Sequence, residues 1–336
     1  MDYPKVTVII PMRNEERFIG PCLESILAND YPMDRVEILV MDGRSTDRSA
    51  QIVLTYAKSH PNIRLLDNPD QIIPAALNLG IRNASGEIII RADAHAQYAQ
   101  DYIRQCVELL LETGAGSVGG AARARGTSYL SWAISYAVSS RFGSGDAKYR
   151  YSNKEEWVDT VFIGAWRRET LERVGGFNVD WLINEDYEFN VRLRKMGYKI
   201  LLSPRIRCEY FVRDSLSKLA RQYFRYGFWK VKTLKAHPES LRWRQLAAPC
   251  FVVALMISLL CLPFSLRAGL IIPLVYSVSN LLAGILISIR RGWRYLPATF
   301  VVFATIHICW VIGFIAGIRR FGMPRVSLAA LLHNLK

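Results

Sequence analysis

The sequence has few cysteines, and none lies in a pattern that predicts a metal site or a disulfide framework. Six cysteines occur in 336 residues, and no CxxC pair is present. Three of them, Cys250, Cys261 and Cys309, fall in apolar stretches, where cysteine usually serves as a small buried side chain. The pattern therefore argues against a disulfide-stabilised domain and against a structural metal site.

The common phosphate-binding loops and a signal peptide are also missing. No GxGxxG follows the first predicted strand, at 5–11, and no GxxxxGK[ST] occurs. This argues against a dinucleotide-dependent dehydrogenase and a P-loop enzyme. The first apolar run, 6–11, is too short for a signal peptide, so we expect the N-terminal part to stay in the cytoplasm.

Positive charge is abundant but unevenly placed. The net charge is +14, and the stretch 205–244 is rich in Lys and Arg with few acidic residues. This basic stretch directly precedes the apolar segments, and such clusters are attracted to anionic lipid head groups. No zinc-finger or basic-zipper pattern is present. We therefore expect membrane lipids, and no nucleic acid, as partners.

Three apolar segments follow the basic stretch, at 246–264, 269–289 and 296–318. Each is long enough for a membrane crossing of about 20 residues. We expect a multi-pass protein of the bacterial inner membrane with its catalytic part in the cytoplasm. The topology stays open, because three crossings would put the arginines at 319–325 outside, against the positive-inside tendency. A re-entrant segment would remove this conflict.

The stretch 214–235 has an amphipathic helical pattern. Leu216, Leu219, Tyr223 and Tyr226 share one face, opposite a basic face. Such a helix suits the membrane interface, although it could also pack on a catalytic domain with its basic face in water. Further on, a GxxxG pattern at 313–317 permits close helix packing, either within the chain or between copies in a homo-oligomer.

The N-terminal part alternates strand and helix patterns. Apolar runs at 5–11, 36–42, 63–66 and 87–91 are each followed by apolar residues at helical spacing. This alternation predicts an α/β fold with a mostly parallel sheet covered by helices on both faces. We divide the chain into a catalytic domain at 1–213, an interface region at 214–245 and a membrane domain at 246–336. Residues 125–158, rich in Gly, Ser, Tyr and Arg, are expected to form a long, mobile segment near the site.

Acidic residues stand where the predicted strands end. Glu15, Asp42 and Asp93 follow the first, second and fourth strands, and Glu185 and Asp186 open a later helix. Helix capping and favourable placement at a helix N-terminus explain some of these residues taken singly. Because ligands of such sheets bind beyond the carboxyl ends of the strands, the set together predicts a binding site at this edge.

The motifs VTVIIPMRNEE, ILVMDGRSTDRS, IIIRADAHA, NEDYEFNVRLRKMG and QYFRY occur in this order. Together they resemble the family 2 glycosyltransferases of the GT-A fold, over about residues 4–230. The stretches VDTVFIGAWRRETLERVGGF and DAHA look most like the bacterial exopolysaccharide glucosyltransferases of the succinoglycan type. The resemblance implies a Rossmann-like GT-A catalytic domain, followed here by the interface helix and the C-terminal transmembrane helices.

The resemblance also implies a role for each matching residue. Nucleotide-sugar binding would fall to eight of them: Pro11, Arg13, Glu15, Asp42, Asp93, Gln222, Arg225 and Tyr226. Asp186 matches the catalytic base. Arg225 would neutralise the leaving diphosphate from a QxxRW motif in which Tyr226 replaces the Trp.

His95 departs from the family pattern, which has a second metal-binding Asp at this position. Histidine is a good ligand for Mn²⁺ and a poor one for Mg²⁺. We therefore expect a divalent metal held by Asp93 and His95, with Mn²⁺ favoured over Mg²⁺. The alternative is that Asp93 alone serves the metal and His95 supports it from behind.

The expected reaction moves a hexose from a UDP-sugar to a lipid-linked saccharide, such as a polyprenyl-diphosphate sugar, with inversion. Trp132, Trp166 and Glu185 are candidate acceptor contacts. A polyprenyl-phosphate hexose synthase and a processive polysaccharide synthase are alternative enzymes. A membrane scaffold that keeps the fold without activity is the non-enzyme alternative.

Overall fold

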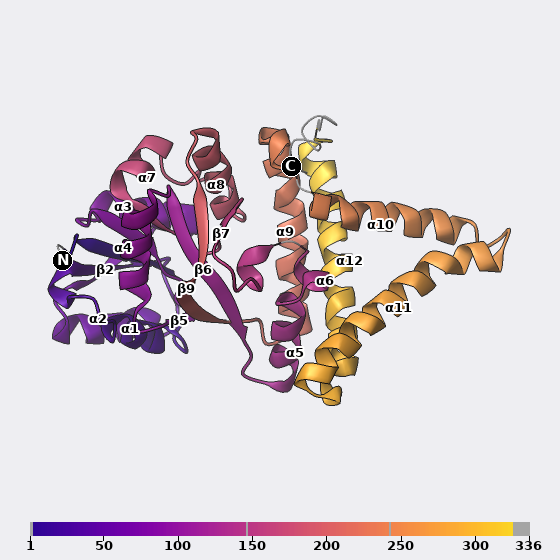
Figure 1. Ribbon diagram of the computed structural model, residues 1–336, viewed down its shortest axis with the longest axis horizontal. Coiled ribbons are helices and arrows are strands. Elements are labelled where there is room, and N and C mark those ends of the chain that lie inside the picture. The colour runs from indigo at the N-terminus through magenta and orange to yellow at the C-terminus, as the bar shows by residue number, and fades with distance from the viewer. Residues whose placement is uncertain (1–2, 146, 242, 325–336) are drawn as a thin grey trace. The chain divides into compact units, whose positions relative to one another are not determined.

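The computed structural model describes residues 3–145, 147–241 and 243–324. The chain forms two compact units (Figure 1). The first comprises Met1–Arg123 and Lys148–Phe211, and the second comprises Ala124–Ala147 and Val212–Lys336. Residues 124–147 thus join the second unit, whereas the sequence-based division placed them in the catalytic domain. The independence of a domain at 1–213 stays a prediction.

The first unit is built on a nine-stranded sheet. Its N-terminal half has four neighbouring parallel strands in the order β3 (Ile63–Asp67), β2 (Val36–Asp42), β1 (Val6–Met12) and β4 (Ile88–Arg91). The register pairs Met12 with Asp42, and Asp42 with Asp67. The ends of these strands therefore lie side by side at one edge.

Short strands extend the sheet beyond β4. β8 (Ala165–Arg167) runs antiparallel to β4 and to β6 (Ser117–Arg125). β6 neighbours β9 (Ile200–Phe211), which pairs in antiparallel fashion with β5 (Ala96–Tyr98) and β7 (Glu156–Val158). The antiparallel half brings β5, directly after Asp93 and His95, against the far strand β9.

Helices cover both faces of the sheet because its central strands are apolar on both sides. On one face, side chains such as Val8 and Ile10 pack with α1 (Ile19–Leu27), α2 (Ser49–Ser59) and α4 (Tyr102–Thr113). On the other face, side chains such as Ile9 and Leu39 share a core with α3 (Ile73–Asn83), α7 (Arg168–Val174) and α8 (Glu185–Lys195). Each such fully buried aliphatic side chain stabilises the fold by about 1.5–3 kcal/mol.

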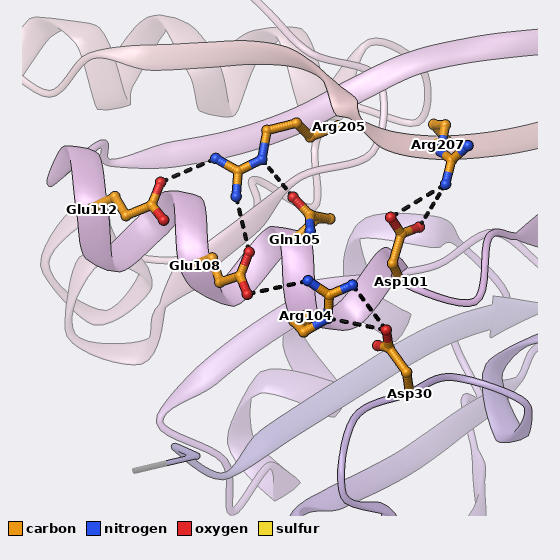
Figure 2. A network of polar contacts seen from close by, with 8 residues as sticks. All are labelled: Asp30, Asp101, Arg104, Gln105, Glu108, Glu112, Arg205 and Arg207. Atoms are coloured by element: carbon orange, nitrogen blue, oxygen red, sulfur yellow. Dashed lines mark hydrogen bonds and ion pairs between the residues drawn. The ribbon is translucent and has the colours of Figure 1, made fainter. Parts of the chain in front are cut away.

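An exposed polar network fastens α4 to β9 (Figure 2). Arg205 on β9 reaches three side chains of α4, donating to Gln105 Oε1 at 2.6 Å, Glu108 Oε2 at 2.9 Å and Glu112 Oε2 at 3.1 Å. The remaining members are Asp30, Asp101, Arg104 and Arg207. Single exposed ion pairs contribute little to stability, but here several of them together link α4 to β9.

The second unit consists of helices. They are α5 (Tyr129–Val138), α6 (Arg141–Ser144), α9 (Leu216–Ala236), α10 (Trp243–Leu260), α11 (Leu266–Arg291) and α12 (Leu296–Phe321). The predicted amphipathic helix is α9. Its apolar face, with Leu219 and Tyr223, packs against α5 and α12 in a small core. In this unit α9 thus lies along a C-terminal apolar helix, and its basic residues Arg221 and Arg225 stay exposed.

Glycines bring α9 and α12 into backbone contact. A Cβ at Gly227 of α9 would lie 1.9 Å from the carbonyl oxygen of Trp310 on α12. A Cβ at Gly313 would lie 1.9 Å from the oxygen of Phe224, and one at Gly317 would lie 2.6 Å from that of Phe228. The GxxxG pattern therefore serves packing within the chain here.

The remaining helices form a hairpin. Figure 1 shows α10 and α11 meeting at a tip, formed by the turn between Leu260 and Leu266, and diverging toward α12, which lies at the open end of the V. Two helical segments, Leu266–Arg291 and Trp293–Phe321, are long and apolar enough to cross a membrane. The first predicted segment, 246–264, corresponds mostly to α10, several of whose side chains lie outside the described residues.

The segment 125–158 is more ordered than we expected. It contains α5, α6, a 3₁₀ turn at Lys148–Arg150 and the strand β7. Ser128 caps α5 through a capping box with Ser131. The buried side chains Ile134 and Val138 then anchor α5 against α12. The Ser- and Gly-rich composition hid this helix, because its apolar stripe is short.

Candidate active site

The loops after β1 and β2 are joined by hydrogen bonds between side chain and backbone. Asn14 Oδ1 accepts from the N–H of Thr46 at 2.8 Å, and the N–H of Asn14 donates to Ser45 Oγ at 2.9 Å. The N–H of Glu15 donates to Ser49 Oγ at 2.7 Å. Asn14 has a left-handed φ of 55°. The two loops thus form one surface that carries Arg13, Glu15 and Asp42.

Asp42 ends β2 within this surface. Its Oδ1 accepts from the N–H of Ser45 at 3.1 Å and from Ser45 Oγ at 2.6 Å. These bonds fix the carboxylate beside the end of β1, which contains Pro11 and is followed by Arg13. Pro11 is half-buried and Arg13 is exposed. The structure therefore groups the residues expected to hold the nucleoside.

Two hydrogen bonds with the Tyr98 hydroxyl hold the turn that carries Asp93 and His95. The N–H of Asp93 donates to the Tyr98 hydroxyl at 2.7 Å, and the Asp93 carbonyl accepts from that hydroxyl at 3.2 Å. His95 Nδ1 lies 3.2 Å from Glu15 Oε1. Two predicted site residues from separate loops, Glu15 and His95, are thus in direct contact.

A buried arginine, Arg91 at the end of β4, joins the carboxylates of the site. Its Nε donates to Asp93 Oδ1 at 3.1 Å, and its Nη1 donates to Glu185 Oε1 at 3.1 Å. The side chains of Arg91 and Glu185 are only 6% and 7% exposed. A buried charge requires such partners, since an unpaired one is costly. Arg91 therefore holds α8, which carries Asp186, next to the Asp93 turn.

The same cluster shifts proton affinities. Burial raises the pKa of Glu185 to about 7, with Asp186 adding to the rise and Arg91 opposing it. Loss of hydration likewise raises the pKa of Asp186, against the effect of Arg91 and with a contribution from Asp93. Burial by itself would lower the pKa of Arg91, but the carboxylates of Asp93, Glu185 and Asp186 raise it overall. Asp186 therefore sits in a site that makes it a stronger base.

Helix α8 is anchored so that its first turn faces this cluster. Asn184, in the left-handed region with φ 63°, starts the helix, and the N–H of Tyr187 donates to Asp186 Oδ1 at 2.7 Å. Arg192 clamps Glu188 through two bonds of 2.8 and 2.9 Å and donates to the Val174 carbonyl at 2.6 Å. These contacts fix the position of Asp186, which stays partly exposed.

Some predicted site residues lie elsewhere. Gln222, Arg225 and Tyr226 are on α9 in the second unit, where Gln222 Nε2 donates to the Tyr226 hydroxyl at 2.8 Å. Trp132 lies on α5 in the same unit, partly exposed, with its ring 5.7 Å from that of Tyr136.

Trp166 lies in the core of the first unit rather than at its surface. It is 4% exposed and packs edge-on against Phe177 and Phe189. Its indole Nε1 has no hydrogen-bond partner among the described residues. In this geometry Trp166 supports β8 and α8 and exposes little of its side chain, and its role as an acceptor contact stays a prediction.

Comparison with known proteins agrees with this geometry. Residues 7–175 match the glycosyl transferase family 2. The succinoglycan biosynthesis protein ExoA of Rhizobium meliloti is 30% identical over 310 residues, which cover 91% of this chain and 93% of that protein. The chain belongs to glycosyl transferase family 2.

Two further comparisons extend this result. A dolichyl N-acetyl-α-D-glucosaminyl phosphate 3-β-D-2,3-diacetamido-2,3-dideoxy-β-D-glucuronosyltransferase of Methanococcus voltae is 30% identical over 246 residues, covering 71% of this chain and 76% of that protein. The structure of mannosyltransferase PcManGT from Pyrobaculum calidifontis, in complex with GDP-Man and Mn²⁺, has a TM-score of 0.60 at 23% identity, covering 95% of this chain and 88% of that one. The predicted GT-A fold and the resemblance to family 2 are both confirmed.

The donor set of this family 2 site fits a divalent metal only in part. Among the described residues, no group of three or more His, Cys, Asp or Glu side chains could hold a metal ion. Asp93 and His95 supply two groups at most, one of them shared with Arg91 and the other with Glu15. Such a pair suits a metal whose remaining ligands are diphosphate oxygens and water.

Arg91 is the residue that sequence reasoning missed. It stands inside the quoted motif IIIRADAHA, between apolar strand residues and Asp93. A charged residue that ends a strand buried on both faces requires a buried partner of opposite charge. The arginine after three isoleucines could therefore have been recognised as part of a buried ion pair. Only the structure shows that one partner, Glu185, lies 94 residues away.

Proposed function

We propose that this family 2 enzyme transfers a hexose from a UDP-sugar to a lipid-linked saccharide at a membrane surface, with inversion, in polysaccharide or glycolipid synthesis. The observation that supports it best is the cluster around Arg91. It sets a carboxylate with a raised pKa, Asp186, beside the Asp93 turn. The succinoglycan role named for ExoA supports the substrate class.

The chemistry assigned to Asp186 is proton removal. The acceptor hydroxyl oxygen forms a bond to the anomeric carbon as the bond from that carbon to the diphosphate oxygen breaks. The bonding electrons leave with the diphosphate, and the hydroxyl proton passes to Asp186. A base with a pKa nearer neutrality accepts this proton more readily. One displacement on the face opposite the leaving group inverts the anomeric centre.

Other residues bind and orient the donor. Asp42 and the loop carrying Arg13 and Glu15 are assigned to the nucleoside, and Asp93 with His95 to the diphosphate end. A divalent metal, when bound, would neutralise charge on the leaving diphosphate. Its presence is supported by the Mn²⁺ in the PcManGT complex. Arg225, assigned to the same charge, is exposed on α9, where Gln222 and Tyr226 hold each other.

The membrane part of the proposal follows from the second unit. Its apolar helices α10, α11 and α12, of which α11 and α12 are long and apolar enough to cross a membrane, support a multi-pass protein of a bacterial inner membrane. An acceptor carried by a membrane lipid would meet the enzyme at that surface. Trp132, partly exposed on α5, is the proposed contact for its saccharide.

The test is nucleoside diphosphate release from a panel of UDP- and GDP-sugars, with and without membrane lipid extract, in Mn²⁺, Mg²⁺ or chelator. We expect lipid- and metal-dependent release from one UDP-sugar. Asp186→Asn should lower the rate about 10²–10⁴-fold, whereas Asp34→Asn, at an exposed carboxylate outside the site, should not. Release with a GDP-sugar alone would refute the UDP assignment.

The Asp186→Asn variant also separates two acceptors. A lipid phosphate is already ionised and needs little help from a base. Full activity of this variant would therefore favour a polyprenyl-phosphate hexose synthase and exclude a sugar hydroxyl as the acceptor. No release from any donor by folded protein would favour the scaffold.

A further inference from the structure

Helix α11 of the α10–α11 hairpin exposes large apolar side chains over much of its surface. On α11 these are Leu266, Leu270, Ile271, Leu274, Val275, Val278, Leu281, Leu282, Leu286 and Ile289. At 100° per residue they cover about 200° of the helix circumference. Only 11% of the most apolar stretch of α11 is buried. A water-exposed helix does not carry such a surface, so α11 requires an apolar solvent.

Helix α12 is different, although it is equally apolar in composition. A third of its most apolar stretch, 33%, is buried. The exposed large side chains Val301, Ile308, Ile312 and Ile315 form one stripe about 60° wide. The opposite side, with Phe303, Gly313 and Gly317, faces α5 and α9. The surface left for lipid is thus one stripe along the helix.

The partner that covers α12 is strongly basic. α9 runs parallel to α12, because Gly227 lies against Trp310 and, further along both helices, Lys235 Nζ donates to the Phe321 carbonyl. Along this length α9 exposes Arg221 and Arg225 on its other side. Each such charge would cost about 2.5–3.5 kcal/mol at the centre of a bilayer. A crossing by α12 would carry α9 and its arginines into the hydrocarbon.

The arrangement of the three apolar helices also argues against a crossing by α12. α12 closes the open end of the V formed by α10 and α11 (Figure 1). When the tip of the V points into a bilayer, α12 lies across the base of the V and therefore along the membrane surface. Its lipid-facing stripe then rests on the hydrocarbon, as in an interfacial helix.

We infer that the α10–α11 hairpin crosses the bilayer and returns, while α12 lies with α9 in the membrane surface and does not cross. The inference deepens the proposed function, because it rests on the membrane association stated there. It places both ends of the hairpin, and the end of α12, on the side occupied by the residues before α10. Lipid is the one occupant assigned to the exposed apolar surface of this hairpin.

The distribution of arginines supports this topology. Arg290 and Arg291 end α11, Arg294 follows the hairpin, and Arg319 and Arg320 lie in the last turn of α12. The two-crossing topology puts all five on one side, whereas three crossings would split them. Arg267 beside the tip is exposed. A tip that stopped within the hydrocarbon would bury this charge, so the tip reaches the far head groups.

The test is side-specific labelling of single cysteines with a membrane-impermeant maleimide. The background lacks Cys250, Cys261 and Cys309 and keeps the buried Cys22, Cys106 and Cys208. Into it we place Ser265→Cys at the tip, Met323→Cys after α12, or Lys58→Cys on α2 as the marker of the catalytic side. Each is labelled in right-side-out and in inverted membrane vesicles of the full-length protein.

We expect Lys58→Cys and Met323→Cys to label in inverted vesicles and Ser265→Cys in right-side-out vesicles, each at least ten times more than in the opposite orientation. Labelling of Met323→Cys on the side opposite Lys58→Cys would overturn the in-plane position of α12. Labelling of Ser265→Cys on the Lys58→Cys side, or protection on both sides, would overturn the crossing. A protein found in the soluble fraction would refute membrane association itself. Labelling requires no catalysis, so an enzyme inactive toward all donors would refute only the transferase proposal.

A second pair of variants tests how deeply α11 and α12 lie in the bilayer. Ile312→Lys on α12 and Leu274→Lys on α11 add the same charge to exposed apolar positions. At the membrane surface a lysine reaches the head groups at little cost, but in the hydrocarbon it does not. We expect wild-type membrane yield for Ile312→Lys and a loss of at least fivefold for Leu274→Lys. Equal losses would contradict the in-plane position.

Discussion

Arg91 Nη1 lies 3.1 Å from Glu185 Oε1, and this contact joins strand β4 to helix α8 across 94 residues of sequence. Both side chains are almost fully buried. The same guanidinium also binds Asp93, so one residue sets the distance between the Asp93 turn and the helix that carries Asp186. The position of Asp186 and its proton affinity therefore both depend on the Arg91 side chain.

Replacing Arg91 by Gln should destabilise the protein and change its pH dependence. Loss of one partner from a buried pair costs about 3–5 kcal/mol. Because Arg91 holds the pKa of Asp186 down, its removal should move the acidic limb of the kcat/KM profile to higher pH. Denaturant unfolding and pH–rate profiles measure these effects. Arg205→Gln, in the exposed network of Figure 2, is the matched control and should leave the profile unchanged. An unshifted profile in Arg91→Gln would refute its role in positioning.

Glu185 should make stability fall as pH rises through the weakly acidic range. Its pKa is about 7 in the folded protein and 4.5 for an ordinary glutamate. Between these values the folded state binds more protons than the unfolded state, so the free energy of unfolding decreases with rising pH. Melting temperatures from pH 4.5 to 7.5 should show this decrease, and Glu185→Gln should flatten it. The exposed Glu172→Gln serves as control and should keep the wild-type slope.

His95→Asp should shift the metal preference. A carboxylate suits both Mg²⁺ and Mn²⁺, whereas imidazole binds transition metals and is a poor ligand for Mg²⁺. We expect the ratio of activity in Mg²⁺ to activity in Mn²⁺ to rise at least fivefold, and chelator to abolish activity in both proteins. An unchanged ratio would mean that Asp93 alone serves the metal and that His95 acts through its contact with Glu15.

Substitution of the glycines between α9 and α12 should separate these helices. In Gly313→Ala the new methyl group would lie 1.9 Å from the Phe224 carbonyl oxygen, and backbone cannot yield as a flexible side chain can. Such overpacking costs about 1–3 kcal/mol. We expect a lower melting temperature and, because Arg225 is on α9, a lower kcat. Gly20→Ala on α1, where the nearest atom is 3.6 Å away, should show neither effect.

The sequence predicted the architecture of the first unit well, because its signals are local. Apolar runs such as 36–42 form the parallel strands, and Glu185 and Asp186 do open a helix. Contacts between distant residues could not be predicted in the same way. The pairing of Arg91 with Glu185 and the contact of Gly227 with Trp310 depend on how elements pack in three dimensions. The burial of Trp166 could not be predicted for a related reason, since a lone tryptophan in a motif gives no signal of burial.

The joined loops after β1 and β2 have a consequence for how this enzyme could diversify. Asn14 and Arg44 are both held in the left-handed backbone region, and bonds from one loop close the other. In the proposed nucleotide pocket, much of the ordering entropy is thus lost during folding instead of during each encounter with the donor. Neither loop can keep its conformation when the other is exchanged. A chimera that takes residues 12–16 from one relative and 42–49 from another would break Asn14–Thr46 and Glu15–Ser49 together, so these segments behave as a single unit of recombination.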